Sequence, residues 1–188
     1  MINCAIDVET TGLDPNFHNM IELGIVPYDD KFRPLKGIKF LSRIKLVNDY
    51  AIDPKALEIN KITLSELEKA PTSSQVRSMF LEWKYQIFGD EKLLPLGHNY
   101  AGFDKLFIQR WLGDFYGKIF DYHSKDSWQV ADICQQIGLI DDDEDLRLET
   151  LRDYLKIDIP QLHSAYFDAL CSLEVYKKCI TMLRKLLN

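Results

Sequence analysis

The stretch IDVETTGLDP, from Ile6 to Pro15, places two carboxylates at the end of an apolar run that begins at Ile2. The run is typical of a buried strand, and the Thr-Thr-Gly that follows is typical of a turn. Alternate side chains of a strand point to one face, so Asp7 and Glu9 should project together. Two buried carboxylates are costly unless they are paired or bind a cation. With no lysine or arginine nearby in the sequence, we expect a bound cation between them.

Two further acids stand at the predicted starts of helices. Asp104 lies in GHNYAGFDKLFI, in the first turn of a helix expected over 103–112, and Asp168 lies in HSAYFDAL, one turn into a last helix expected over 165–187. A lone acid at such a place is ordinarily explained by the helix macrodipole. His163, five residues before Asp168, would by itself be explained by capping or packing.

Taken together, the four acids and the histidine make chemical sense. A two-metal site needs several oxygen ligands that hold two divalent ions about 3.5–4 Å apart. Carboxylate oxygens suit Mg²⁺ or Mn²⁺. His163 could take a proton from the attacking water, because an imidazole titrates near pH 6.5. The set predicts phosphodiester hydrolysis.

Three motifs also carry a resemblance. IDVETTGLDP, HNYAGFD and HSAYFDA occur in that order between residues 6 and 169. They resemble the three motifs of the DEDDh-type 3′–5′ exonucleases, a family that includes bacterial polymerase proofreading subunits and RNase T. One departure is the spacing of the middle motif, where Asp104 follows His98 by six residues rather than the commoner five.

The resemblance implies an α/β, RNase H-like fold: a central mixed five-stranded sheet, its second strand antiparallel to the rest, with helices on both faces. It implies that Asp7, Glu9, Asp104 and Asp168 hold two divalent ions, Mg²⁺ or Mn²⁺. His163 would be the general base. All five would then be catalytic.

The resemblance also implies substrate contacts. Thr10 and Leu13 would touch the 3′-terminal nucleotide, and His98 and Asn99 would line the substrate channel. For Phe103, packing near the terminal base and packing in the core both stay open. The expected partners are the 3′ ends of single-stranded DNA or RNA, and the expected products are nucleoside 5′-monophosphates. The choice between DNA and RNA stays open.

The bulk properties indicate one domain over residues 1–188, since 188 residues of which 46% are hydrophobic can bury one core. No long charge-free stretch and no secretory signal are present, so we expect a cytoplasmic protein without a membrane partner. A net charge of −6 argues against a broad basic surface for duplex nucleic acid.

Two alternatives differ in what the chain does. A catalytically silent binding module is disfavoured because all five motif residues are present. A proofreading subunit with a polymerase partner usually carries an extension after the nuclease domain, whereas this sequence ends with its last helix; we therefore expect stand-alone action. A homodimer stays open, as several stand-alone relatives are dimers.

Overall fold

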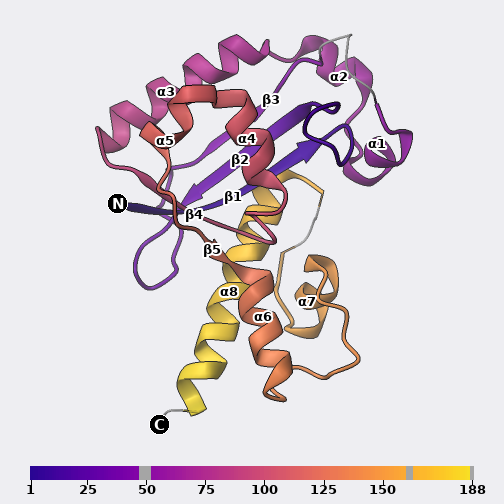
Figure 1. The fold of residues 1–188 in the computed structure, drawn as a ribbon, viewed down its shortest axis with the longest axis vertical. Helices are drawn as coiled ribbons and strands as arrows, with labels where there is room; N and C mark the ends of the chain where they lie inside the picture. The colour runs from indigo at the N-terminus through magenta and orange to yellow at the C-terminus, as the bar shows by residue number, and fades with distance from the viewer. Residues whose placement is uncertain (47–51, 160–162, 187–188) are drawn as a thin grey trace.

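A computed structural model describes residues 1–46, 52–159 and 163–186. The strands form one five-stranded sheet, which lies among the helices (Figure 1). The strands are β1 (Ile2–Thr10), β2 (Met20–Pro27), β3 (Phe40–Arg43), β4 (Leu93–Gly97) and β5 (Lys125–Asp126). The α-helices are α1 (Pro54–Asn60), α2 (Leu64–Lys69), α3 (Ser73–Phe88), α4 (Asp104–Leu112), α5 (Tyr116–Ile119), α6 (Ser127–Gln136), α7 (Leu148–Tyr154) and α8 (Ala165–Leu186), and η1 (Gly113–Phe115) is a 3₁₀ turn.

The sheet order is β3-β2-β1-β4-β5. β1 pairs in parallel with β4, and β4 with β5, whereas β2 is antiparallel to both of its neighbours. The second strand is therefore antiparallel to the rest, as the family resemblance implied, and the mixed five-stranded sheet is confirmed. β1 is the central strand, between β2 and β4, and not an edge strand of the sheet.

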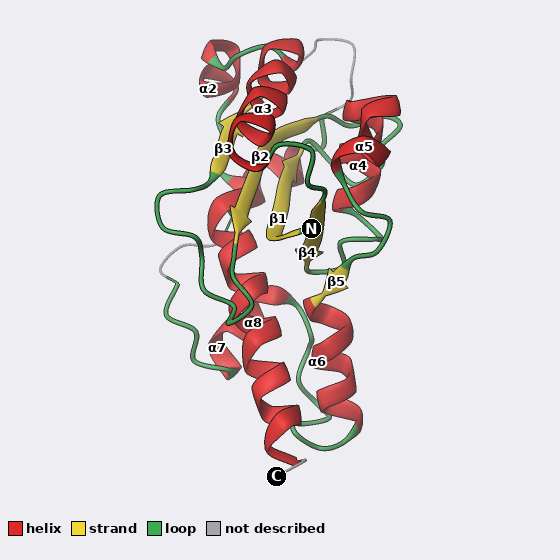
Figure 2. Ribbon diagram, turned by 90° about the vertical axis from the view of Figure 1, so that its left-hand side faces the viewer, coloured by secondary structure: helices red, strands yellow, loops and turns green. Residues whose placement is uncertain are grey.

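Both faces of the sheet are covered by helices. One face packs Ile6, Val8 and Leu23 against α3 and α4, in a core that includes Phe80 and Phe107. The other face packs Ala5, Val26 and Leu96 against Ala169 and Leu173 of α8. Figure 2 shows the sheet between these layers. Every residue of β2 is buried, as expected for a strand covered on both sides.

A second core lies below the sheet, where α6, α7 and the later part of α8 come together (Figures 1 and 2). Its buried members are apolar or cysteine: Ala131, Cys134, Ile140, Leu151, Ile157, Cys171, Val175 and Cys179. Cys4, the remaining cysteine, is also buried, and all four thiols are free.

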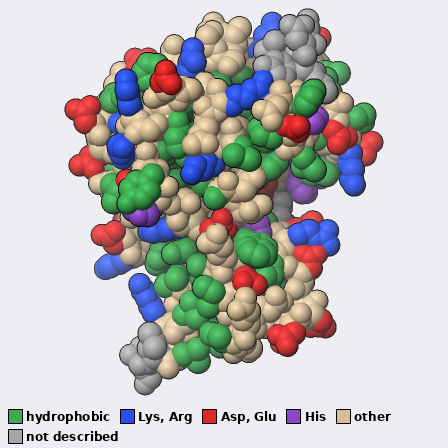
Figure 3. Space-filling view, in the orientation of Figure 1, with side chains coloured by type: hydrophobic (Ala, Val, Ile, Leu, Met, Phe, Trp, Pro, Cys, Tyr) green, Lys and Arg blue, Asp and Glu red, His purple; other side chains and the backbone are tan. Residues whose placement is uncertain are grey.

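The surface carries both signs of charge. Lys and Arg side chains are scattered among Asp and Glu on the face drawn in Figure 3, rather than gathered in one basic patch. This distribution agrees with the acidic net charge of −6. In the part of the chain that the structure describes, no helix has the length and apolar character required to cross a membrane.

Candidate active site

β1 presents the first two acids as its sequence pattern predicts. Ile6 and Val8 are buried against α3 and α4, and the side chains of Asp7 and Glu9 project from the opposite face, toward α8. Their pairing partners on β2 are Gly24 for Asp7 and Glu22 for Glu9.

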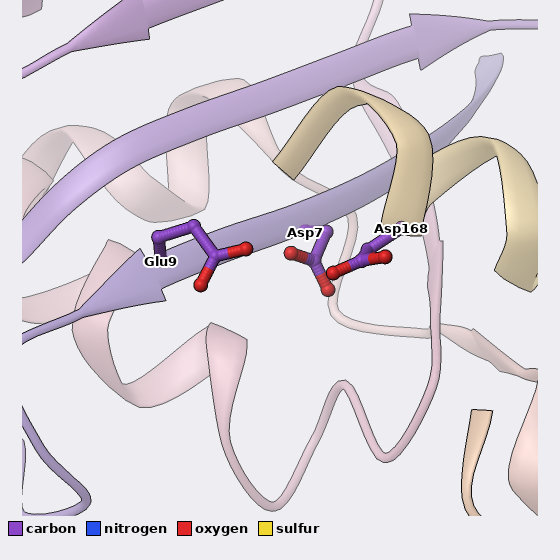
Figure 4. A group of neighbouring side chains, drawn as sticks. All are labelled: Asp7, Glu9 and Asp168. Atoms are coloured by element: carbon purple, nitrogen blue, oxygen red, sulfur yellow. The ribbon is translucent and has the colours of Figure 1, made fainter. Parts of the chain in front are cut away.

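The third acid comes from α8. Carboxyl oxygens of Asp7, Glu9 and Asp168 lie within 4.8 Å of one another. Figure 4 shows Asp7 and Glu9 along β1, with the carboxylate of Asp168 next to that of Asp7. The backbone N–H of His163 donates to both oxygens of Asp168, at 3.1 and 3.3 Å. Residues 161 positions apart in the chain thus form one cluster, which we call the carboxylate trio (Asp7, Glu9 and Asp168).

A glycine makes this convergence possible. A Cβ placed on Gly24 would lie 2.4 Å from the backbone carbon of Ala165 and 2.5 Å from its oxygen. The first turn of α8 therefore rests directly on the backbone of β2, beside the strand position of Asp7. A side chain at Gly24 would push α8 away and take Asp168 with it.

Asp104, the first residue of α4, is 2% exposed, and its carboxylate contacts the backbone of β1. β4 pairs with β1 only as far as Ala5, so the later part of β1 has an open flank. There the Oδ1 of Asp104 accepts the backbone N–H of Val8 at 3.0 Å. Asp104 is not a member of the trio, but its hydrogen bond to Val8, the residue between Asp7 and Glu9, places its carboxylate on the same strand segment.

The four carboxylates disfavour each other's ionisation. Burial, followed by the charges of Asp104, Asp168, Glu9 and Glu22, raises the pKa of Asp7 well above its usual range. Burial and the same kind of repulsion raise the pKa of Glu9 to about 9.

The pKa values of Asp104 and Asp168 rise to about 7. Burial is the largest cause for both, and the backbone hydrogen bonds that each carboxylate accepts lower the pKa only in part. The neighbouring charges that act on Asp7 and Glu9 are all negative. A divalent cation fits this environment, because it would supply the missing positive charge and prefers carboxylate oxygens.

His163 occupies an unusual backbone conformation, with φ of 70°. Its N–H fixes Asp168, as described above, whereas its imidazole has no hydrogen-bond partner among the residues that the structure describes. The ring is partly exposed. The role of general base stays a prediction.

The turn after β1 holds the first pair of predicted substrate residues. Thr10 is buried, and its hydroxyl donates to the carbonyl of Gly12 at 2.8 Å, inside the turn. Leu13 is 78% exposed. An apolar side chain is therefore displayed on the surface four residues after Glu9, while the Thr10 side chain helps to shape the turn.

His98 and Asn99 line a surface pocket together with Trp128, Leu146 and Arg147. Both ring nitrogens of His98 are engaged: Nε2 donates to the Leu146 carbonyl and Nδ1 contacts the Ser127 hydroxyl, each at 2.9 Å. Burial lowers the pKa of His98 and so favours its neutral ring.

Asn99 and Phe103 occupy the loop between β4 and α4. Asn99 has φ of 63°, and its N–H donates to Asp126 at 3.0 Å. Phe103 is partly buried against the main core, with its ring 5.1 Å from that of Phe107. The core reading of Phe103 thus has a contact in its favour, and the substrate roles of both residues stay predictions.

Glu22 is a residue of this region to which the sequence reasoning gave no role. It is 5% exposed, and its carboxylate accepts the N–H of Ala165 at 2.9 Å. The only signal in the sequence is an acid within the apolar run MIELGIV. Two of its partners, Ser164 and Ala165, lie more than 140 residues away in the chain, so no local pattern reveals them.

Comparisons with known proteins agree with this geometry. Residues 4–176 match a family model described as Exonuclease. A comparison with curated protein sequences finds no match.

Solved structures give a further comparison. Escherichia coli Exonuclease I in complex with a dT13 oligonucleotide is 22% identical, with a TM-score of 0.77 over 99% of this chain and 42% of that one. A zinc-bound complex of the same enzyme with single-stranded DNA is 19% identical, with a TM-score of 0.80 over 98% of this chain and 42% of that one.

Exonuclease I from Methylocaldum szegediense is 18% identical, with a TM-score of 0.78 over 98% of this chain and 40% of that one. At these identities the likeness shows a shared fold, and the chain spans about two fifths of the length of these solved proteins. The family match covers most of the chain, and the resemblance to DEDD-type 3′–5′ exonucleases is confirmed. The chain therefore belongs to the exonuclease family.

Proposed function

We propose that the protein is a metal-dependent 3′–5′ exonuclease that removes nucleoside 5′-monophosphates from single-stranded nucleic acid. The observation that carries this proposal is the carboxylate trio, whose oxygens lie within 4.8 Å of one another at the end of the central strand. Membership of the exonuclease family gives such a cluster its chemical context. The solved complexes of Escherichia coli Exonuclease I with dT13 and with single-stranded DNA suggest single-stranded DNA as the first substrate to test.

In this proposal Asp7, Glu9 and Asp168 supply the oxygen ligands for two Mg²⁺ or Mn²⁺ ions. Asp104 completes the set from α4, where the Val8 N–H orients its carboxylate. When bound, the ions would activate water and neutralise the charge that develops on the phosphate. Oxygen ligands of this kind favour Mg²⁺ and Mn²⁺ over softer metals.

The remaining roles belong to groups around the trio. His163 would accept the proton of the attacking water, because an imidazole nitrogen can act as a general base. Its backbone N–H holds Asp168, so one residue would position a ligand and carry a proton. The exposed Leu13 would pack against the terminal nucleotide, and the pocket at His98 and Asn99 would take the strand that leads to it.

Digestion of oligonucleotides labelled at the 5′ end tests the direction and the substrate. Single-stranded DNA and RNA of one sequence are incubated with Mn²⁺, and a matched oligomer carries a blocked 3′ end. We expect a ladder that shortens from the free 3′ end and no cleavage of the blocked oligomer. Cleavage of the blocked oligomer would contradict an exonuclease that starts at the 3′ end. An intact free-ended substrate would contradict the activity itself.

A further inference from the structure

Glu22 lies beside the carboxylate trio on β2. It pairs directly with Glu9, so the two side chains share a sheet face. Its charge raises the pKa of Asp7 and Glu9. A further buried negative charge here is unfavourable unless its oxygens are satisfied by donors. The contacts of its carboxylate show which donors satisfy it.

Both oxygens of Glu22 are engaged by protein groups. Oε2 accepts the backbone N–H of Ala165 at 2.9 Å and the hydroxyl of Ser164 at 3.2 Å. Oε1 faces the Nε of Arg43 at 3.5 Å. Glu22 is not a member of the trio. Its oxygens point to the start of α8 and to β3, which argues for a structural task rather than direct ligation.

The groups that Glu22 binds belong to the turn that carries the chemistry. Ser164 and Ala165 lie between His163 and Asp168, and the N–H of Asp168 donates to the carbonyl of Ser164 at 3.0 Å. Ala165 also packs directly against the backbone at Gly24, so no side chain separates β2 from α8 at this point. A shift of Ala165 would therefore move Asp168 and His163 together.

We propose that Glu22 is a positioning residue: its hydrogen bonds to Ser164 and Ala165 fix the first turn of α8, and so set Asp168 and His163 against Asp7 and Glu9. The inference rests on the proposed function, because positioning matters for catalysis only if these groups are catalytic. Mutation of a residue that orients metal ligands typically lowers metal affinity or activity about 10–100-fold.

Arg43 orients the positioning carboxylate. It is the β3 partner of Glu22, and its guanidinium also contacts Glu66 at 2.6 Å. Glu66 in turn closes the capping box of α2 with Thr63. The side chain of Glu22 is thus held between α8 on one side and an anchored arginine on the other.

Two substitutions separate hydrogen bonding from charge. Glu22→Ala removes the acceptor, whereas Glu22→Gln keeps one oxygen for Ala165 and loses the charge. We expect Glu22→Ala to lower kcat and Mn²⁺ affinity about 10–100-fold, with the KM for the oligonucleotide within about threefold, and Glu22→Gln to recover most of both. Cooperative thermal unfolding of each variant checks that it folds.

Hydrogen exchange gives a readout that needs neither metal nor substrate. The amide of Ala165 should exchange at least about tenfold faster in Glu22→Ala than in the wild type, and about as slowly in Glu22→Gln. Glu149→Ala is the matched control, because Glu149 also raises the pKa of Asp168 but is exposed and makes no hydrogen bond to this turn among the described contacts. It should leave exchange unchanged.

The outcomes are distinguishable. Unchanged Ala165 exchange in Glu22→Ala would overturn the inference even if the protein proved to be an active nuclease. A Glu22→Gln variant as impaired as Glu22→Ala would also overturn it, because charge and not hydrogen bonding would then matter. A wild type that neither cleaves nor binds Mn²⁺ would overturn the proposed function, and exchange would still report whether Glu22 holds the turn.

Discussion

At the scale of single residues, the site depends on acids held where their charges are unfavourable. Asp7 and Glu9 could be predicted from the sequence because an i, i+2 spacing on a strand fixes a shared face. Glu22 could not, because one buried acid in an apolar strand does not reveal partners at Ser164 and Ala165. Local periodicity reports which face a residue occupies, and only the tertiary fold decides what it meets there.

Asp7→Asn should separate catalysis from stability. The substitution keeps the shape of the side chain but removes the ionisable carboxyl group. Burial and four neighbouring acids raise the pKa of this group. We expect cleavage to fall by at least about 100-fold, because several kcal/mol of charge stabilisation are lost. In EDTA at pH 8 the melting temperature should equal or exceed that of the wild type.

Asp142→Asn is the control for this experiment, since Asp142 is an exposed acid in the loop after α6. It should change neither cleavage nor melting. A lower melting temperature for Asp7→Asn in EDTA would contradict the repulsion that the structure indicates.

His163→Asn tests whether the imidazole carries the proton. Asparagine tolerates the left-handed conformation at this position, where φ is 70°, and keeps the backbone N–H that holds Asp168. We expect kcat to fall about 10²–10⁴-fold with Mn²⁺ affinity nearly unchanged. Calorimetric titration with Mn²⁺ and steady-state cleavage measure the two quantities. An equal loss of both would assign the ring to metal binding instead.

At the scale of elements, the contact between β2 and α8 decides whether the acids meet. The sequence predicted the last helix over 165–187, and the structure has α8 over Ala165–Leu186. It did not predict that Gly24 would lie against Ala165, because that close approach joins segments 141 residues apart. A glycine inside a strand was the only local sign.

Gly24→Ala should weaken this contact. The new methyl group would come within 2.4 Å of backbone atoms, which cannot give way as a flexible side chain does. We expect the free energy of unfolding to fall by about 1–3 kcal/mol, and cleavage to fall with it as Asp168 moves. Urea denaturation measures the first change.

Gly117→Ala, in α5, is the matched control because a Cβ there meets nothing within 4 Å. It should leave stability unchanged or raise it by up to about 1 kcal/mol. If Gly24→Ala and Gly117→Ala changed the free energy of unfolding equally, the backbone of Ala165 would be able to move away from the new methyl group at little cost, which would contradict the prediction.

At the scale of the whole molecule, one half of the chain supplies the strand acids and the other half supplies α8. The three motifs therefore lie far apart along the chain, and their order could be recognised from the residues alone. The family model likewise matches residues 4–176. The resemblance also gave the sheet topology, since composition and periodicity do not fix the order of strands. The contacts of the His98 ring with Ser127 and Leu146 could not be predicted, because neither the motifs nor the local sequence pattern indicates them.

Without metal, the protein should become less stable as the pH rises. In the folded state burial and mutual repulsion raise the pKa of Glu9 to about 9 and those of Asp104 and Asp168 to about 7. Above about pH 4 the folded state therefore binds more protons than the unfolded state, and the free energy of unfolding decreases with pH up to about 9.

Melting temperatures in EDTA between pH 5 and pH 9 measure this dependence. We expect a decline across that range, and a recovery at pH 8 when Mn²⁺ replaces EDTA, because binding to the folded state stabilises it. A melting temperature that rises from pH 5 to pH 9 in EDTA would contradict the raised pKa values.

The central claim is that the carboxylate trio binds divalent metal and that this metal drives cleavage. The most direct measurement follows Mn²⁺ binding and the rate of single-stranded DNA cleavage in the same samples as Mn²⁺ is titrated into metal-free protein. We expect the rate to rise with occupancy of the site, and both signals to disappear in Asp7→Asn. Cleavage that persists without bound Mn²⁺, or binding that survives in Asp7→Asn unchanged, would contradict the account.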